Sequence, residues 1–387
     1  MTEFALQADR IFNGDQFLEN HAVVVEQNRI SAVTARSELP SDMVVENLGS
    51  GVLAPGFIDW QVNGGGGVLF NNDTTVNGIR RILRGHYQGG TTGLLPTLIS
   101  DTQSARGLAV MATRAAIAEG EQSVLGLHLE GPYFAAAKRG THHEAFMASP
   151  SDAEIAWLID NADLPLLVTL APEVVGCQQI QRLSDAGVIV CAGHTNADAA
   201  TVNKALRAGL RGFTHLYNAM RPATGREPGV VGAALVDRQA WCGIIADGHH
   251  VHADMIRLAW HAKPTGKLCL VSDAMATVGG VHRSFELYGQ TITERDGRLL
   301  NSEGNLAGSA ITMIDAVRIA HQLAGIELGE VLRMASLYPA EFLRQPKLGL
   351  VKPGYRADLV HFNSEFQVQQ TWVAGQAKLP SNKRVLS

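Results

Sequence analysis

Short apolar runs alternate with amphipathic stretches through the middle of the chain. Eight runs are apolar at consecutive positions, which is typical of parallel strands buried on both faces. They cover residues 52–59, 93–99, 124–130, 166–170, 188–194, 212–215, 241–247 and 268–273. Helical patterns separate most of them, at residues 76–87, 105–118, 152–161, 197–208 and 255–261. Ser151 and Asn196 are expected to cap two of these helices.

Eight strands that alternate with helices indicate an α/β fold of the TIM-like (β/α)8 barrel type. The alternative is an open doubly wound sheet. No G-x-G-x-x-G pattern follows an early strand, which disfavours the open sheet. The glycine run 64–67 does not match a phosphate loop. We expect it to let the backbone pass close to the barrel mouth or to a ligand.

Both ends of the chain have a different pattern, with short strands and no long helix. Strand patterns occur at residues 4–12, 21–26 and 29–33, and again at 358–362 and 366–373. The two ends are expected to combine into one small β-sandwich domain, formed by residues 1–53 and 348–387. The catalytic barrel would then span residues 54–347.

Polar and titratable side chains end nearly every predicted barrel strand. The active sites of (β/α)8 barrels lie at the carboxyl ends of the strands, so these residues are the candidates for chemistry. They are Asp59 and Gln61, Thr97, Glu130, Glu173, His194, His215, Asp247 with His249 and His250, and Asp273.

Three of these residues form a candidate metal site. Glu130, His194 and His215 would supply one carboxylate and two imidazoles, a set that suits zinc or iron(II) and leaves a position open for water. The alternative is that all three cap strands and bind loops. Asp273 is the candidate acid/base for water activation. Its alternative role is a helix N-cap.

Two further positions have open alternatives. His142 is either a group that polarises a carbonyl or binds a sugar hydroxyl, or part of a solvated loop with His143. Arg226 lies in a long loop punctuated by glycine and proline, and arginine suits phosphate or carboxylate. From the sequence alone, a salt bridge between Arg226 and Glu227 or another loop carboxylate is the favoured interpretation.

Composition adds only weak limits. The 387-residue chain is 46% hydrophobic and 18% charged, as in ordinary soluble proteins. A net charge of −5 disfavours nucleic acid and anionic membranes as partners. The four cysteines have no C-x-x-C spacing, and neither a signal segment nor an 18-residue apolar run is present. We therefore expect a cytoplasmic protein that binds neither nucleic acid nor a membrane.

Seven motifs together resemble one enzyme family. They are PGFID at 55–59, HLEGP at 128–132, AGHTNA at 192–197, THLYNAM at 214–220, GREPG at 225–229, IADGHHV at 245–251 and VSDA at 271–274. In this order they resemble the N-acetylglucosamine-6-phosphate deacetylases of the amidohydrolase superfamily, from about residue 8 to about residue 375.

The resemblance implies a metal-dependent barrel that hydrolyses N-acetyl-D-glucosamine 6-phosphate to D-glucosamine 6-phosphate and acetate, in amino-sugar catabolism. It implies Glu130, His194 and His215 as ligands of one divalent ion, with zinc preferred and iron(II), manganese or cobalt as alternatives. It implies Asp273 and His142 as catalytic residues. The implied substrate-binding residues are His142, Asn218, Ala219, Arg226, His250, Gln61, Leu306 and Ala307.

The resemblance also implies a homodimer in which Arg226 reaches the neighbouring active site, which reverses the salt-bridge interpretation. Most amidohydrolases carry His-x-His at the end of the first strand, where this chain has Asp59-Trp60-Gln61. Glutamine is a poor ligand, and the glycine run 64–67 lacks a cysteine that some relatives have, so one metal is expected. The competing hypotheses are another amidohydrolase, such as an N-acyl-amino-acid deacylase or a nucleobase deaminase, and a non-catalytic barrel that serves as a scaffold.

Overall fold

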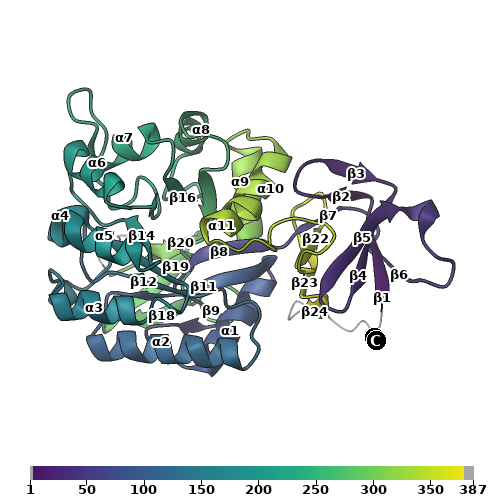
Figure 1. Ribbon diagram of the computed structural model, residues 1–387, viewed down its shortest axis with the longest axis horizontal. Helices are drawn as coiled ribbons and strands as arrows, with labels where there is room; N and C mark the ends of the chain where they lie inside the picture. Colours follow the sequence, from purple (N-terminus) through teal and green to yellow (C-terminus); the bar gives the residue numbers. More distant parts are fainter. Residues whose placement is uncertain (1–2, 303, 305, 379–387) are drawn as a thin grey trace.

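The computed structural model describes residues 3–302, 304 and 306–378. Eight parallel strands form one sheet in which the spatial order follows the chain order, so the (β/α)8 barrel is confirmed and the doubly wound alternative is wrong (Figure 1). The strands are β8 (Phe57–Val62), β11 (Thr91–Ile99), β12 (Leu127–Glu130), β13 (Leu166–Leu170), β14 (Ile189–Ala192), β15 (Gly212–Phe213), β16 (Trp241–Ile245) and β17 (Leu268–Val271).

The barrel closes where the chain beyond β17 returns to β8. The backbone N–H of Asp273 donates to the carbonyl of Gln61 at 3.0 Å, and that of Asn63 donates to Ala274 at 2.9 Å. Inside the barrel, the fully buried Trp60 ring lies 5.1 Å from the ring of Phe342. A Cβ at Gly243 would lie 2.4 Å from Trp60, so only glycine leaves room for that indole.

Helices follow the strands in the predicted alternation. They are α1 (Val76–Tyr87), α2 (Gln103–Ala118), α3 (Asp152–Asp160), α4 (Pro172–Val175), α5 (Cys177–Asp185), α6 (Ala199–Arg207), α7 (Gly229–Val236), α8 (Ala253–Ala262), α9 (Met313–Gln322), α10 (Leu328–Ala335) and α11 (Leu337–Phe342). Ser151 caps α3 in a capping box, as predicted. The predicted cap at Asn196 is wrong, because Asp198 caps α6. No helix in the described part of the chain is long and apolar enough to cross a membrane.

The two chain ends build a small sandwich beside the barrel (Figure 1). One sheet has the order β5-β4-β1-β6 and the other has the order β24-β23-β22-β7-β2-β3. Leu6, Leu53 and Trp372 belong to one buried cluster, so both ends share a core. The strands are β1 (Glu3–Gln7), β2 (Arg10–Phe12), β3 (Phe17–Glu19), β4 (His21–Glu26), β5 (Arg29–Ala35), β6 (Val44–Asn47), β7 (Val52–Pro55), β22 (Leu359–Phe362), β23 (Val368–Val373) and β24 (Gln376–Lys378).

Two predictions about the strands need correction. Residues 4–12 are not one strand, because β1 and β2 belong to different sheets. A four-stranded sheet between β17 and α9 was not predicted; it consists of β18 (Ser284–Leu287), β19 (Gln290–Arg295), β20 (Arg298–Leu300) and β21 (Leu306–Ser309). The domain limits at residues 53/54 and 347/348 stay a prediction, and residues 1–2 and 379–387 of the predicted small domain lie outside the described residues.

The glycine run approaches the barrel mouth, as expected. Gly64 N–H donates to the carbonyl of Ala274, directly after Asp273, at 2.9 Å. A Cβ at Gly66, where φ is +60°, would lie 2.3 Å from the carbonyl oxygen of Arg81. His86 fixes the glycine run, because its Nε2–H donates to the carbonyl of Gly64 at 2.9 Å. Burial lowers the pKa of His86 from 6.5 to about 4, so this imidazole stays neutral in the folded protein at neutral pH.

We predict that His86 makes the fold acid-sensitive. Because the folded-state pKa is lowered, its contribution is fully present above pH 6.5 and is lost as the pH falls towards 4. A shift from 6.5 to about 4 corresponds to about 3 kcal/mol of unfolding free energy. Replacing His86 with Gln, which keeps an N–H donor and does not titrate, should flatten this part of the profile. Urea unfolding of the metal-free protein between pH 7 and 4 measures it.

The matched control is His282→Gln at an exposed position. It should leave the pH profile of stability as in the wild type. A slope in His86→Gln that equals the slope of the wild type would show that burial of this imidazole does not govern the acid sensitivity.

Candidate active site

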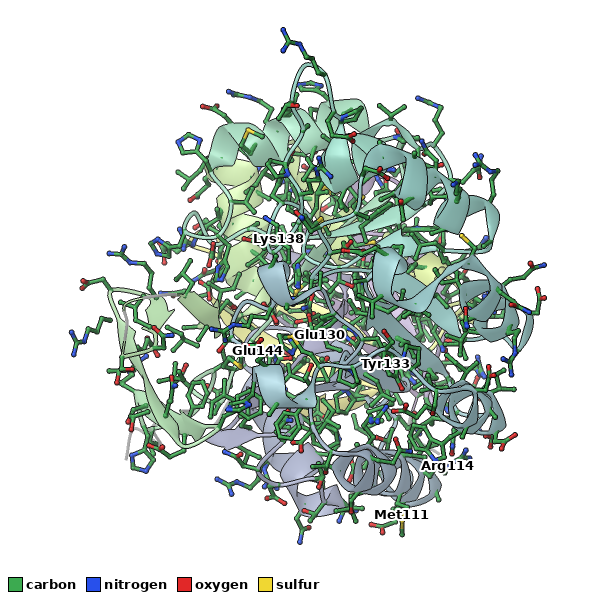
Figure 2. The ribbon with its side chains drawn as sticks, turned by 90° about the vertical axis from the view of Figure 1, so that its left-hand side faces the viewer. Met111, Arg114, Glu130, Tyr133, Lys138 and Glu144 are labelled. Atoms are coloured by element: carbon green, nitrogen blue, oxygen red, sulfur yellow. The ribbon has the colours of Figure 1, made fainter. Side chains whose placement is uncertain are left out.

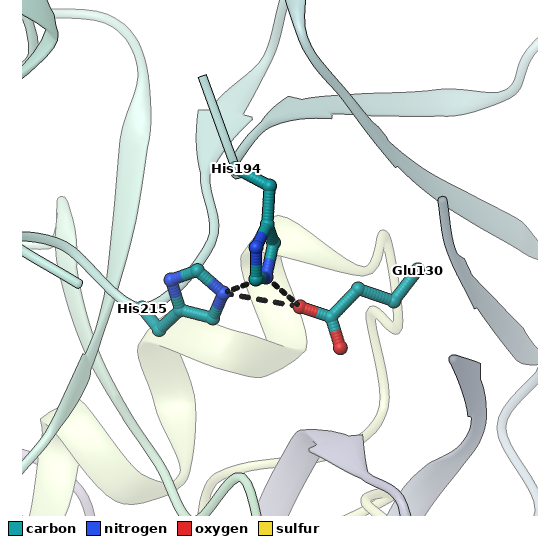
Figure 3. A group of neighbouring side chains, drawn as sticks. All are labelled: Glu130, His194 and His215. Carbon is teal, nitrogen blue, oxygen red and sulfur yellow. Dashed lines mark hydrogen bonds and ion pairs between the residues drawn. The ribbon is translucent and has the colours of Figure 1, made fainter. Parts of the chain in front are cut away.

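Glu130, His194 and His215 converge at the carboxyl ends of the barrel strands β12, β14 and β15 (Figure 3). Glu130 ends β12, and each histidine lies two residues beyond its strand, β14 or β15. Glu130 Oε1 lies 3.1 Å from His215 Nε2 and 3.3 Å from His194 Nε2, and the two Nε2 atoms are 3.0 Å apart. All three residues are buried. The structure therefore brings together the three side chains predicted from separate strands.

The donor set fits a divalent metal ion. The Nδ1–H of His194 donates to the carbonyl of Lys138 at 2.9 Å, which leaves the lone pair of Nε2 facing Glu130 and His215. The three ligand atoms lie within 4.8 Å of one another. Two imidazole nitrogens that face each other at 3.0 Å repel unless a proton or a cation lies between them. A carboxylate and two neutral imidazoles match the ligands that zinc and related ions take in catalytic sites.

The carboxylate of this group is ionised despite its burial. Burial alone would raise the pKa of Glu130, but the interactions of its carboxylate with the rings of His194 and His215 outweigh burial and hold the pKa well below its usual range. Glu130 can therefore offer a negatively charged oxygen atom to a bound cation.

Three of the candidate site residues have a left-handed backbone. The φ angle is +49° at His194, +38° at His215 and +53° at Asp273. This conformation is uncommon for residues other than glycine and costs of order 1–3 kcal/mol at each position. Local hydrogen bonds hold one of these turns, since Glu173 accepts from Thr195 Oγ1 and from the Asn196 N–H, both at 2.6 Å. At these three positions the left-handed backbone occurs where the side chain turns into the barrel mouth.

Asp273 lies beside the metal group and does not cap a helix. The next helix in the described chain, α9, begins only at Met313, so the N-cap alternative is wrong. The Asp273 carboxylate accepts from Asn63 Nδ2 at 2.6 Å and from Gln61 Nε2 at 3.1 Å. Burial, and then the negative charge of Glu130, raises the pKa of Asp273 to about 6. A carboxyl group with such a pKa is suited to exchange protons near neutral pH.

The first barrel strand presents two amides to this centre. Gln61 Nε2 donates to Glu130 Oε1 as well as to Asp273, and Asn63 lines the cavity. Asp59 lies deeper, where its carboxylate accepts from Ser272 Oγ at 2.5 Å, and burial raises its pKa to about 7. The side chains of this segment that face the Asp273 carboxylate are therefore those of Gln61 and Asn63, two residues apart. Asn63 was missed, although the two-residue period of a strand places it on the same face.

A cavity of about 180 Å³ covers the group. Its lining includes most of the predicted residues, namely Glu130, His142, His194, His215, Asn218, Ala219, His250, Asp273 and Leu306. It also includes residues not predicted, namely Asn63, Ile99, Gly140, Thr141, Met275 and Gly308. In Figure 2, Glu130 lies near the middle of the view, below Lys138 and beside Glu144, and both of these residues belong to the segment that follows β12.

Three predicted substrate-binding residues do not line this cavity. Gln61 is buried behind Glu130 and Asp273. The Ala307 side chain packs in a hydrophobic cluster with Met275 and Leu299, so substrate contact through this side chain is not supported. Arg226 is exposed and makes no ion pair within the described residues. The salt-bridge interpretation is wrong for its neighbour Glu227, which instead accepts from the backbone N–H groups of Ala199 and Gly229.

Two histidines border the metal group with defined tautomers. His142 Nδ1 accepts from the Ser100 N–H at 3.2 Å, so the neutral ring carries its proton on Nε2. Burial lowers the pKa of His142 well below its usual range and keeps the ring neutral. His250 Nδ1 donates to Asp247 Oδ2 at 2.5 Å, which fixes that ring at the cavity wall. His249 is exposed, so one member of this adjacent pair faces inwards and the other outwards.

Comparison with known proteins agrees with this geometry. The Amidohydrolase family matches residues 52–378, and the NagA composite domain matches residues 4–52. The chain belongs to the amidohydrolase family. It is 40% identical to an N-acetylgalactosamine-6-phosphate deacetylase of Shewanella sp. (strain ANA-3), over 97% of this chain and 96% of that protein. It is 34% identical to an N-acetylglucosamine-6-phosphate deacetylase of Haemophilus influenzae, over 97% of this chain and 99% of that protein.

Solved structures of this amidohydrolase family agree equally well. N-acetylglucosamine-6-phosphate deacetylase from Pasteurella multocida superposes with a TM-score of 0.94 at 38% identity, over 97% of this chain and 99% of that one. A variant of the Mycobacterium smegmatis deacetylase in complex with N-acetyl-D-glucosamine-6-phosphate has a TM-score of 0.91 at 30% identity, over 98% of this chain and all of the other. The family predicted from the motifs is therefore confirmed.

We predict that Glu130, His194 and His215 bind one divalent ion per chain. Replacing His194 with Ala should weaken zinc binding by more than the roughly 10–100-fold that loss of an outer hydrogen-bond partner costs. His143→Ala, at an exposed position of the nearby loop, is the matched control and should bind zinc normally. Elemental analysis and zinc titration of chelated, reloaded protein measure both. Equal zinc affinity in the two variants would contradict the assignment.

Proposed function

We propose that the chain hydrolyses the acetamide of N-acetyl-D-glucosamine 6-phosphate to D-glucosamine 6-phosphate and acetate, a step of amino-sugar catabolism. The observation that carries the proposal is the position of Asp273 beside Glu130, His194 and His215 in one cavity. The substrate class is supported by relatives that match the chain over nearly their full length. They are named as deacetylases of N-acetylhexosamine 6-phosphates. The required chemistry is activation of water and hydrolysis of an amide.

The residues of the chain divide this work. A divalent ion held by Glu130, His194 and His215, with zinc as the first candidate, would supply Lewis acidity that activates water and polarises a carbonyl. Asp273 accepts the proton of the attacking water and then returns it to the amine nitrogen as the C–N bond breaks. Gln61 and Asn63 hold that carboxylate in place. The neutral His142 donates from Nε2 to the carbonyl oxygen as negative charge develops there.

The phosphate group would bind away from the reacting bond and position the substrate. We propose that His250, Asn218 and the backbone near Ala219 and Ala307 contact the sugar phosphate within one subunit. Arg226 is exposed on its own chain, which suits a role in the active site of a second subunit. The homodimer, the trans contact of Arg226, the identity of the metal and the cytoplasmic location are predictions of the same proposal.

Loss of the Asp273 carboxylate tests the reaction. We predict that Asp273→Asn lowers kcat for N-acetylglucosamine 6-phosphate by roughly 10²–10⁴-fold, because proton transfer is lost, while the zinc content stays normal. Asp42→Asn, at an exposed position in the small domain, should retain wild-type turnover. Amine release measured together with zinc content decides. Turnover of Asp273→Asn close to that of Asp42→Asn would rule out the assigned role.

Loss of the Arg226 guanidinium tests phosphate recognition. We predict that Arg226→Ala raises KM for the phosphorylated sugar by about 10–100-fold, the equivalent of one charged hydrogen bond, and leaves kcat/KM for N-acetylglucosamine unchanged. Mixing Arg226→Ala with Asp273→Asn should restore sites with a normal KM, because Arg226 of one subunit completes the intact active site of the other. Equal losses on both sugars would contradict phosphate recognition, and no recovery on mixing would contradict the trans contact.

A second substrate has a specific observation in its favour. The relative with 40% identity is named as an N-acetylgalactosamine-6-phosphate deacetylase. The two sugars differ at C4, away from the acetamide, so the same centre serves both. The ratio of kcat/KM values for the two phosphates decides between them. A nucleobase or an N-acyl amino acid as the better substrate would favour the competing amidohydrolase hypothesis, and a zinc-loaded protein without hydrolysis would favour the scaffold.

A further inference from the structure

A second cavity opens at the opposite end of the barrel. It measures about 500 Å³ and is lined at the amino-terminal ends of β14, β15 and β16, by residues that include Val188, Leu210 and Ala240. The catalytic residues lie beyond the carboxyl ends of the same strands, so this basal cavity is separate from the active site. This end of a (β/α)8 barrel ordinarily serves stability.

The charge of the basal cavity is strongly asymmetric. Arg207, Arg211 and Arg344 line it, and none of the three forms an ion pair with a carboxylate within the described residues. Asp237 is the one carboxylate among the described lining residues. Its Oδ1 is already bound by the backbone N–H groups of Gln239 at 2.9 Å and Ala240 at 2.7 Å. Three guanidinium groups therefore share a concave surface with one engaged carboxylate.

Arg211 is fixed in position. Its Nε and Nη2 both donate to the carbonyl of Phe342 at 3.3 Å, and its guanidinium lies 4.5 Å from the centre of the Trp241 ring. Lys267 Nζ also approaches that ring, at 3.0 Å from the ring centre. Burial, and then the charge of Arg344, lowers the pKa of Arg211. The half-buried Arg211 guanidinium is repelled by the positive charge of Arg344. A bound anion would offset this repulsion.

We propose that the basal cavity binds the phosphate group of a small phosphorylated metabolite. Arginine forks match phosphate oxygens, and Arg211 is held ready for such contact. The neutral side chains of Ser184, Asn203 and Gln239 line the same space and suit the hydroxyl groups of a polyol or sugar. A volume of about 500 Å³ is typical of small-molecule sites. The proposal does not depend on the reaction at the other end of the barrel.

The test is phosphate binding by the metal-loaded protein. Isothermal titration with inorganic phosphate, at constant ionic strength set with chloride, should give a class of sites, in addition to any at the active site, that weakens about tenfold or more in the double variant Arg207→Gln/Arg344→Gln. Both arginines are exposed, so the variant should fold, and equal melting temperatures in chloride verify it. Arg238→Gln, exposed and outside the cavity lining, is the matched control and should bind as the wild type does. Any binding at the active site is common to all three proteins.

Two outcomes overturn the proposal. If the double variant binds phosphate as tightly as the wild type, phosphate does not bind in the basal cavity. If Arg238→Gln loses as much affinity as the double variant, the effect comes from general surface charge. Titration with glucose 6-phosphate distinguishes a metabolite from free phosphate. Tighter binding of the sugar phosphate that is lost in the double variant supports a phosphorylated metabolite, whereas affinity no higher than that of inorganic phosphate overturns the metabolite part of the proposal.

Discussion

The arrangement of the active site depends on three ligand atoms that face one another at about 3 Å in a buried place. Glu130 Oε1 and the Nε2 atoms of His194 and His215 cannot stay there without a proton or a cation between them. Several surrounding features place and orient these three side chains. The parallel strands bring the three residues to one edge, and the carbonyl of Lys138 fixes the ring of His194. Each histidine adopts the left-handed backbone that turns its side chain inwards.

The contact that closes the barrel also positions Asp273, the proposed acid/base. The hydrogen bond from Asp273 N–H to the Gln61 carbonyl joins the last strand to the first. The side chains of Gln61 and Asn63 then hold the Asp273 carboxylate, and Gln61 also reaches Glu130. A shift of the first strand would therefore disturb Glu130 and the Asp273 carboxylate together.

The sequence predicts the barrel and the convergence of Glu130, His194 and His215 because both depend on repeated local patterns. Apolar runs that end in Glu130, His194 and His215 indicate parallel strands whose carboxyl ends meet at one edge. The sequence fails where contacts are specific to the tertiary structure. Asp198 rather than Asn196 caps α6, and the β18–β21 sheet has short strands with weak alternation. Asn63 follows the strand period but was not recognised, because an amide has no metal-ligand signature. Arg226 was assigned by resemblance, because its proposed role involves a second subunit, which patterns along one chain do not indicate.

The most direct test of the central claim is amine release from N-acetylglucosamine 6-phosphate before chelation, after chelation and after return of a divalent metal. If the buried Glu130, His194 and His215 group is a metal centre that drives deacetylation, chelation should abolish turnover and metal should restore it. The order of restoration by zinc, iron(II), manganese and cobalt would identify the preferred ion. Full activity in protein verified to be metal-free, or no activity in folded and metal-loaded protein, would contradict the account.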